Sequence, residues 1–418
     1  MAFNTALSGI RAAGADLDII GNNVANAGTV GFKASRGEFA DIYAASTLGT
    51  SALAIGSGVR LSDVAQQFKW GNINFTDNPL DIAINGDGFF RLNDGGAIVY
   101  TRAGMFKRDD EGYIINNDGY RLTGYLADGR GNITGQIGDL RLDNSNIMPR
   151  ATDDVFATLN LNANEIEPST PWPATVDPDN PPPADTYNWA TSLTVFDSLG
   201  NGHIMSMYFR KLDADATATP PIGDNTWEVH VLVDGNEATA TPHRLEFDSS
   251  GVLSTGATMS IVNHALGNGA APLSFDISFN GTTQSGSAFA INGLNQTGYT
   301  TGRMTSLDID PSGILYARYS NGESKAMGQV VLANFTNPQG LQPLGNTTWG
   351  ETAASGLPLV GAPGTSNLGV VQGGALEDSN VDLTQELIKM IVAQRNYQAN
   401  AQTIRTEDAV TQAIINIR

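Results

Sequence analysis

Apolar residues recur at helical spacing at both ends of the chain. The first stripe alternates steps of four and three residues, as a heptad does, through Phe3, Leu7, Ile10, Gly14, Leu17, Gly21 and Val24. The second stripe has the same spacing and runs through Leu383, Leu387, Met390, Gln394, Tyr397, Ala401 and Ile404. Asp382 followed by Gln385 is typical of a helix N-cap, and no Pro or Gly interrupts the chain after Val381. We therefore predict a helix at each end and expect the two helices to pair as a coiled coil.

Three glycines interrupt the first predicted helix. Gly9, Gly14 and Gly21 each cost about 1 kcal/mol relative to Ala, so this helix is expected to be marginal on its own. Two explanations remain open. Either the helix packs on its own domain like any terminal helix, or the glycines let the backbone of a partner come close.

Between the two helical stripes the pattern changes to the alternation of half-buried strands. Examples are SLTVF at 192–196, WEVHVLV at 227–233 and SLDID at 306–310. An Asp-x-x-Gly tetrad, whose spacing suits type I turns in bulged hairpins, recurs at 109–112, 197–200, 248–251 and 310–313. The sequence thus predicts a mainly β fold with terminal α-helices, built from nested, discontinuous antiparallel domains that resemble sandwiches or barrels.

Composition marks the boundaries between these domains. The segment Glu167–Asp185 has seven prolines in nineteen residues, 213–224 is a second loop-like stretch, and both are expected at the surface. We predict four parts: a terminal helical coiled-coil domain (1–27 and 377–418), a connecting segment (28–70 and 371–376), an inner β domain (71–148 and 300–370) and an inserted acidic outer β domain (149–299).

Negative charge is concentrated in the predicted outer domain. The chain has 43 acidic and 23 basic residues, a formal net charge of −20, and residues 151–299 hold 17 of the acidic but only 3 of the basic residues. Such a field repels phosphate and anionic lipid, so we expect no nucleic-acid partner and no membrane insertion. No run of 18 apolar residues is present, and the first twenty residues lack the basic start and apolar centre of a secretory signal peptide.

No pattern in the sequence indicates a catalytic, metal or cofactor site. The absence of cysteine excludes disulfides and thiolate chemistry. DIDPSG at 308–313 imitates the start of a calcium loop, but its twelfth position is Tyr319, where a bidentate Glu is needed. The four histidines lack metal-binding spacing and are expected to be solvated or hydrogen-bonded at the surface. Neither a GxSxG elbow nor a nucleotide-phosphate loop occurs, so we expect no enzyme and no cofactor.

Three stretches resemble one known family. NNVANAGTVGFKASR at 22–36 is similar to the signature that follows the N-terminal helix in bacterial flagellar axial proteins, although Val30 stands where the family commonly has Pro. DNPLDIAINGDGFFRL at 77–92 resembles the family's first β segment, and the stretch that begins GALEDSN at 374 resembles its C-terminal signature. Within this family of rod, hook and hook-associated proteins, the insertion at 149–299 and the segment 328–356 resemble the hook members.

That resemblance implies a structural subunit. Hook subunits polymerise into a curved hollow tube, a universal joint that links the rod to the filament and passes motor torque. The terminal helices would form the inner tube through contacts between copies, and the β blocks would form outer layers. Phe32 would be an anchor and Lys33 a partner for acids on a neighbour; alternatively, this Gly-Phe-Lys turn packs on its own domain. The implied assembly residues are Phe3, Leu7, Ile10, Leu17, Val24, Asn26, Phe32, Lys33, Leu383, Leu387, Met390, Tyr397 and Ile404.

The resemblance also implies partners and a location. The partners would be other copies of the chain, rod and hook-associated proteins at the ends of the tube, and the hook cap and export apparatus during assembly. The location would be the extracellular flagellum (hook and basal body), reached by flagellar export without a cleaved signal peptide. A distal rod or hook-associated protein is the alternative within the family. Outside it, the alternative is an exported β-rich enzyme or adhesin that acts on glycans.

Overall fold

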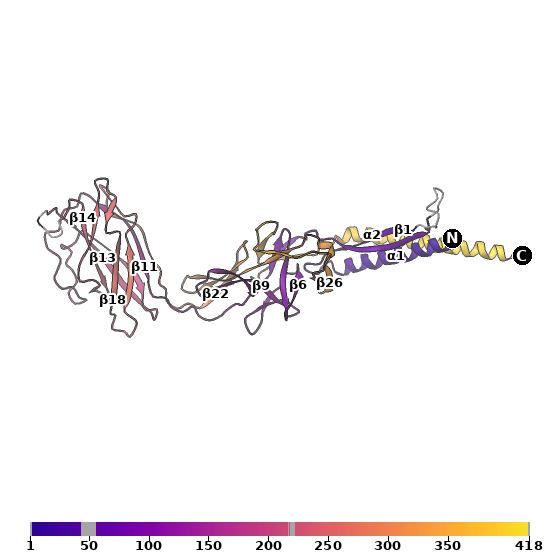
Figure 1. Cartoon of the computed structure of the whole chain (residues 1–418), viewed down its shortest axis with the longest axis horizontal. Helices are drawn as coiled ribbons and strands as arrows, with labels where there is room; N and C mark the ends of the chain where they lie inside the picture. Colours follow the sequence, from indigo (N-terminus) through magenta and orange to yellow (C-terminus); the bar gives the residue numbers. More distant parts are fainter. Residues whose placement is uncertain (1, 43–55, 216, 218–221, 417–418) are drawn as a thin grey trace. The chain divides into compact units, whose positions relative to one another are not determined.

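The chain divides into two compact units. The computed structural model describes residues 2–42, 56–215, 217 and 222–416. The helix unit comprises Met1–Asn144, Ser306–Arg318 and Ser324–Arg418, and the β unit comprises Ser145–Thr305 and Tyr319–Glu323. Figure 1 shows both ends of the chain in the helix unit, where indigo and yellow segments lie side by side.

The two terminal helices pair in antiparallel fashion. Helix α1 spans Ala2–Ala25 and α2 spans Leu383–Asn416. The Asn23 side-chain amide donates to Glu386 Oε2 at 3.2 Å, whereas Gly9, fourteen residues earlier, faces Asn400. At the start of α2, Asp382 Oδ1 accepts the backbone N–H groups of the next helical residues at 2.9 and 3.2 Å. The predicted helices, their pairing and this N-cap are confirmed.

A β-hairpin packs along α1. Strands β1 (Ser35–Ile42) and β2 (Gly58–Gln66) pair antiparallel, with Ser35 opposite Gln66. The Val59 N–H donates to the Ser8 hydroxyl of α1 at 3.1 Å, and a Cβ on Gly37 would lie 3.1 Å from the Ile19 side chain. No pattern in the sequence predicted this hairpin, which lies in the expected connecting segment.

The remainder of the helix unit is an antiparallel β structure around two hydrophobic clusters. Its 13-stranded sheet contains a path in the order β22-β23-β24-β9-β5-β6-β27-β26. The sheet's strands are β5 (Phe89–Asp94), β6 (Ala97–Thr101), β7 (Lys107–Arg108), β8 (Ile114–Ile115), β9 (Arg121–Ala127), β10 (Ile133–Asp139), β22 (Met304–Ile309), β23 (Ile314–Tyr319), β24 (Ser324–Val330), β25 (Leu332–Asn334), β26 (Gln342–Gly345), β27 (Thr348–Gly350) and β28 (Leu359–Gly361). One cluster contains the fully buried Phe90, Ile114 and Leu122, and the other is aromatic, with Tyr100 edge-on to Phe335 at 4.8 Å.

Two short ladders join distant parts of the chain within this unit. Strand β3 (Ile73–Phe75) pairs with β30 (Ala375–Glu377), and β4 (Ile82–Asn85) pairs with β29 (Val370–Gly373). A short 3-10 helix spans Pro338–Gly340. The ladders hold the chain returning towards α2 against the segment that left α1.

The β unit is a two-sheet structure with one shared core. The first sheet contains β12 (Trp189–Phe196), β13 (Gly202–Leu212), β14 (Thr226–Val233), β15 (Asn236–Glu237), β16 (His243–Phe247) and β17 (Leu253–Thr255). The second contains β11 (Asp154–Asn162), β18 (Thr258–His264), β19 (Leu273–Ser278), β20 (Thr283–Ser285) and β21 (Ala290–Gln296). Met207 and Trp227 of the first sheet and Leu159 and Ile277 of the second are fully buried in one cluster. Alternate residues of strands from both sheets therefore point into this core.

The Asp-x-x-Gly tetrads form the predicted turns. In each, the glycine N–H donates to the aspartate carbonyl at 2.9–3.1 Å. The four glycines have positive φ, from +82° to +91°, a conformation that residues with a Cβ rarely adopt. These turns and the sheets confirm the predicted fold class, a mainly β protein with terminal helices.

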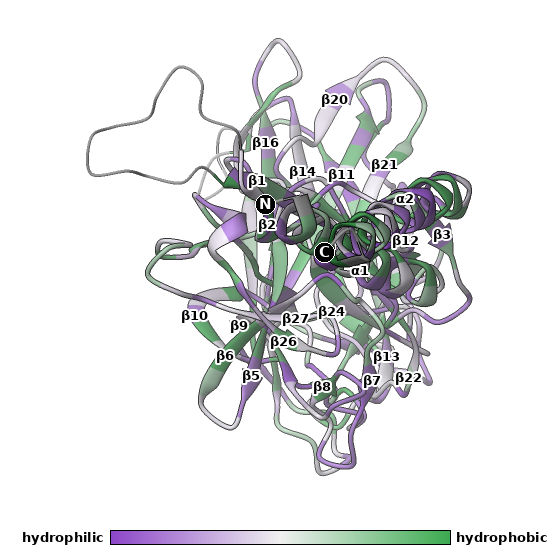
Figure 2. Cartoon of the chain, turned by 90° about the vertical axis from the view of Figure 1, so that its right-hand side faces the viewer, coloured by the Kyte–Doolittle hydropathy of each residue, from purple (hydrophilic) through white to green (hydrophobic). Residues whose placement is uncertain are grey.

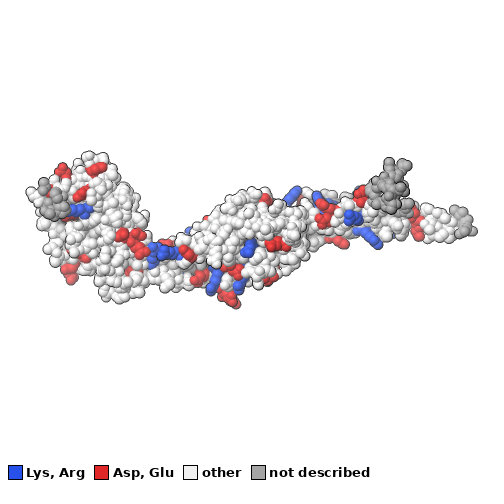
Figure 3. All heavy atoms as spheres, viewed as in Figure 1, with Lys and Arg blue, Asp and Glu red and all other residues white. Residues whose placement is uncertain are grey.

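Surface charge and the proline-rich segment also bear on the predictions. On the face drawn in Figure 3, acidic side chains are spread over the β unit with few basic ones. The segment Glu167–Asp185 has no named strand, and its Trp172 stacks on His230 at 3.9 Å. The second predicted loop, 213–224, lies partly outside the described residues. Neither described helix has the length and apolar character needed to cross a membrane.

Candidate assembly surface

One side of α1 is buried and faces α2. Ala6, Ala13 and Ile20 are buried and recur every seven residues along one side of the helix. Near them, a Cβ on Gly9 would lie 2.5 Å from the Asn400 side-chain oxygen, so that glycine permits the close approach. At about 100° per residue, the predicted heptad stripe lies roughly 80° round the helix from this contact. The α1 stripe is therefore not centred on its contact with α2.

Helix α2 repeats this arrangement. Glu386 and Ala393, seven residues apart, are buried against α1, whereas Leu383, Leu387 and Tyr397 of the predicted stripe are about half exposed. The centre of this stripe also lies roughly 70° round from the contact, in the same rotational sense as in α1, although Met390 and Ile404 are partly buried and Ile404, five turns after Glu386, lies on the contact side. Because the helices are antiparallel, rotations of the same sense carry both stripes to the same side of the pair. We call this surface the assembly face, and it consists of Phe3, Leu7, Ile10, Leu17, Val24, Leu383, Leu387, Met390, Tyr397 and Ile404.

The assembly face is partly open within the described part of the helix unit: Phe3, Leu383, Leu387 and Tyr397 are 41–50% exposed, whereas its other six side chains are partly buried. The hairpin contacts α1 through Ser8 and Ile19, and Leu7 of the stripe lines a groove beside the hairpin strand β2. A Cβ added to Gly14 or Gly21, which are part of the stripe, would meet no atom within 4 Å. Figure 2 shows hydrophobic residues on the outer sides of both helices. The structure thus brings ten of the predicted assembly residues onto one surface.

Helix α2 is longer than its partner. The facing pairs Asn23–Glu386 and Gly9–Asn400 place the start of α1 opposite the residues just after Asn400. The last turns of α2 therefore project beyond α1, as Figure 1 shows at the end marked C. Val410, Ile414 and Ile415 are exposed there.

The segment after α1 makes a compact turn. The Asn23 side chain bonds both backbone groups of Ser35, each at 2.8 Å, and the Asn26 amide donates to the Asn22 carbonyl at 3.0 Å. Gly31 has φ +70°, and a Cβ there would lie 2.5 Å from the backbone nitrogen of Ala103. Asn26 thus ends the helix within its own chain, and Gly31 is required by both conformation and space.

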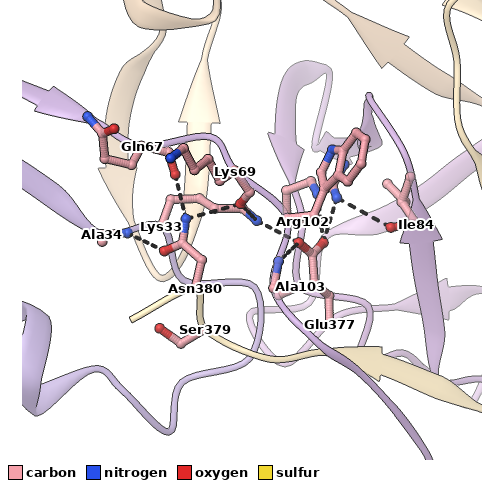
Figure 4. Close-up of polar contacts among 12 residues, drawn as sticks. Lys33, Ala34, Gln67, Lys69, Ile84, Arg102, Ala103, Glu377, Ser379 and Asn380 are labelled. Atoms are coloured by element: carbon pink, nitrogen blue, oxygen red, sulfur yellow. Dashed lines mark hydrogen bonds and ion pairs between the residues drawn. The ribbon is translucent and has the colours of Figure 1, made fainter. Parts of the chain in front are cut away.

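A buried ion network lies directly behind this turn (Figure 4). Glu377, at the end of β30, is fully buried and binds two cations. Its Oε1 accepts from Lys33 Nζ at 2.6 Å, and its Oε2 lies 2.7 Å from an Arg102 Nη. Oε1 also accepts the Gly71 N–H at 2.9 Å. The network joins the exit of α1, the turn after β6 and the chain entering α2.

The two cations of this network are buried at an energetic cost that Glu377 offsets. Burial lowers the pKa of Lys33, and the attraction of Glu377 opposes that effect. Burial likewise lowers the pKa of Arg102, again opposed by Glu377. Arg102 also donates to the carbonyls of Gly86 and Gly88 at 2.9 and 2.6 Å.

The prediction that Lys33 pairs with acids on a neighbouring copy is wrong. Its ammonium group is buried and bonded to Glu377 and to the Lys69 carbonyl, at 2.9 Å, in its own chain. Phe32 is half-buried and lines an open groove of about 590 Å³ together with Met105 and Trp349. No local pattern could have found Glu377, because it lies 344 residues from Lys33.

Metal-binding groups and the positions of the histidines bear on the other predictions. No group of three or more His, Asp or Glu side chains among residues 2–42, 56–215, 217 and 222–416 could hold a metal ion. His243 Nε2–H donates to the Gly256 carbonyl at 2.8 Å. His203 and His230 are buried, however, which differs from the surface positions expected for the histidines.

Comparisons with known proteins agree along the whole chain. Family models match at 3–33 (flagella basal body rod protein), 83–152 (flagellar hook protein FlgE/F/G D1 domain), 160–299 (flagellar basal body protein FlaE D2 domain) and 372–417 (flagellar basal body rod FlgEFG protein C-terminal). The flagellar hook protein FlgE of Escherichia coli strain K12 is 40% identical over 423 residues, covering 100% of both chains. The protein of that name from Salmonella typhimurium strain LT2 is 39% identical over 428 residues, again covering 100% of both.

A solved structure supports the fold, and the relatives identify the family. The crystal structure of Helicobacter pylori flagellar hook protein FlgE2 matches with a TM-score of 0.54 at 15% identity, covering 73% of this chain and 100% of that one, and supports the fold. The full-length hook relatives favour a hook subunit over a rod or hook-associated protein. The chain therefore belongs to the flagellar hook protein family, and it is a structural subunit of the bacterial flagellar hook.

Proposed function

We propose that the assembly face joins copies of this chain into the hook tube. The observation that carries this proposal is the unpaired apolar surface shared by α1 and α2. Leu387 is 50% exposed, and burying the exposed half of such a side chain contributes about 1 kcal/mol. Phe3, Leu383 and Tyr397 are 41–49% exposed as well, and these four side chains together would supply a cooperative contact between copies.

The parts of the chain would have separate tasks in the tube. The terminal helices (1–27 and 377–418) would form the inner layer, with the connecting segment (28–70 and 371–376) around them. The inner β domain (71–148 and 300–370) would form the next layer, and the outer β domain (149–299) would lie outside it. An acidic outer domain makes weak contacts that can slide, and such contacts would let a curved tube rotate as a universal joint and pass torque to the filament.

The remaining expectations belong to the same proposal. Rod and hook-associated proteins would contact the two ends of the tube, and the hook cap and export apparatus would act during assembly. The chain would reach the outside of the cell by flagellar export without a cleaved signal peptide. Its role would be mechanical, without catalysis or a cofactor.

The test is tube formation by the full chain under polymerising salt, observed by electron microscopy. Leu387→Asp places a charge on the assembly face and is expected to abolish tubes while the β-sheet circular dichroism is unchanged. Leu357→Asp is the matched control, because Leu357 is 87% exposed and lies outside both helices. A chain that ends at Asp382 keeps Glu377 and removes α2, and should also fail to assemble. Normal tubes from either the Leu387 variant or the shortened chain would overturn the proposal.

A further inference from the structure

One histidine of the β unit contacts two carboxylates. His203 lies on β13, and its side chain points to the core side of the sheet, as do those of Met205 and Met207. Its Nδ1 lies 2.5 Å from Asp234 Oδ2, and its Nε2 lies 3.2 Å from Asp197 Oδ2. The His203 side chain is only 10% exposed and that of Asp197 is fully buried, whereas Asp234 is 46% exposed.

The two contacts of His203 require its imidazole ring to be protonated. A neutral imidazole has one N–H and one bare nitrogen, so it can donate to only one of two carboxylates. The other contact would then set a lone pair against a carboxylate oxygen. The imidazolium donates at both nitrogens and satisfies both. Burial alone would lower the pKa of His203, but the hydrogen bonds to Asp234 and Asp197 outweigh it and raise the pKa.

The two carboxylates accept hydrogen bonds from residues that belong to both sheets of the β unit. Asp197 opens the β12–β13 turn and accepts the Asn268 amide at 2.7 Å, and Asn268 belongs to the β18–β19 connection of the other sheet. In the same region the Ala271 N–H donates to the Ser198 hydroxyl at 3.0 Å. Asp234, in the β14–β15 turn, accepts the backbone N–H next to His203 at 2.9 Å.

We propose that the doubly hydrogen-bonded His203 imidazolium is a proton-dependent latch at this end of the β unit. The titratable groups that face it are Asp197 from the β12–β13 turn, Asp234 from the β14–β15 turn and His264 from the end of β18. When His203 loses its proton, one carboxylate contact becomes repulsive. The β18–β19 connection, residues 265–272, then opens more often, because Asn268 and Ala271 are tied to the same turn as Asp197.

The direction of the pH effect follows from linkage. The folded pKa of His203 lies above the unfolded value, so the latch contributes its full stability below about pH 6.5. That contribution is lost as the pH rises through the folded pKa. Each unit by which the pKa is raised changes the opening equilibrium of the latch tenfold. Opening of 265–272 is therefore expected to increase between pH 6 and pH 9, by a factor set by the pKa of His203 in the folded chain.

Two measurements on the full chain test the latch. In protein labelled with ¹⁵N-histidine, long-range proton–nitrogen spectra should show both ring nitrogens of His203 still protonated above pH 6.5, the ordinary pKa of the imidazole. Amide hydrogen exchange of 265–272, corrected for the intrinsic pH dependence of exchange, should show opening that increases with pH by the factor that the measured pKa of His203 sets. Exchange in the core strand β14 should change less.

Two variants separate a latch from a purely structural histidine. His203→Gln cannot titrate, so its 265–272 segment should open readily at pH 6 and show no further increase at pH 9. His243→Gln is the matched control, and the pH dependence should survive in it. A His203 ring that titrates at or below pH 6.5 in the wild-type chain would overturn the proposal, whether or not the variants fold. Equal pH dependence in wild type and His203→Gln would also overturn it.

Discussion

Replacing Glu377 with Gln tests whether the buried ion network holds the helix unit together. The substitution preserves the shape of the side chain but removes its charge. One oxygen of Glu377 serves Lys33 and Gly71, and the other serves Arg102, so a single amide oxygen can satisfy only one side. The amide NH₂ would then face a cation that also only donates. Removing one partner of a buried ion pair costs about 3–5 kcal/mol, because the remaining charge is left uncompensated.

The assay is denaturant unfolding of the full chain, with circular dichroism and intrinsic fluorescence recorded together. The helix unit should unfold earlier in the variant by about 3–5 kcal/mol, whereas the transition of the β unit should not move. Glu38→Gln is the matched control. Its ion pair with Arg36 is exposed, and the loss should stay below about 1 kcal/mol. A loss for Glu377→Gln no larger than that of the control would refute the reasoning.

Three further changes have distinct expected outcomes. Gly31→Ala should destabilise the helix unit by more than about 1 kcal/mol in thermal unfolding, because the φ of Gly31 is +70° and the added Cβ would lie 2.5 Å from a backbone nitrogen. Gly28→Ala is the control and should cost less, because a Cβ at Gly28 would meet no atom within 4 Å. Gly14→Ala should raise helix stability by up to about 1 kcal/mol in far-UV melts, and Gly9→Ala should not, because its Cβ would meet Asn400. On acidification the β unit should lose stability below about pH 4, because burial raises the pKa of Asp197 but its hydrogen bonds outweigh burial and hold that pKa well below its usual range. A melting temperature of the β unit that does not change below pH 4 would contradict this prediction.

Local features of this protein were predictable and long-range ones were not. Asp-x-x-Gly turns depend on four adjacent residues, so Asp310 and Gly313 alone indicate a turn. The heptad stripes likewise revealed the helices. Which side of each helix faces the other depends on the close approach of Gly9 and Asn400, residues from opposite ends of the chain. The ion network has the same character, because Glu377 is placed beside Lys33 by a strand, β30, that pairs with the distant β3.

The distribution of large and small residues on α1 argues that helix order depends on assembly. The contact with α2 uses Ala6, Ala13 and Ile20, and each alanine methyl contributes only about 0.8 kcal/mol when buried. That is little against three glycines in the same helix at about 1 kcal/mol each. Phe3, in contrast, is 49% exposed on the assembly face, where another copy of the chain would bury it.

Hydrogen exchange in the two states tests this dependence. Amides of α1 should exchange rapidly in the free chain and at least tenfold more slowly in the tube, since 1.4 kcal/mol corresponds to a factor of ten and several half-exposed side chains would be buried. Strand β6, which lies in the core of the helix unit, is the internal reference and should exchange equally slowly in both states. If α1 were as protected in the free chain as in the tube, the helix pair would be stable by itself. The large residues of the assembly face would then not be needed to order the helices, and they would contribute only to the affinity between copies of the chain.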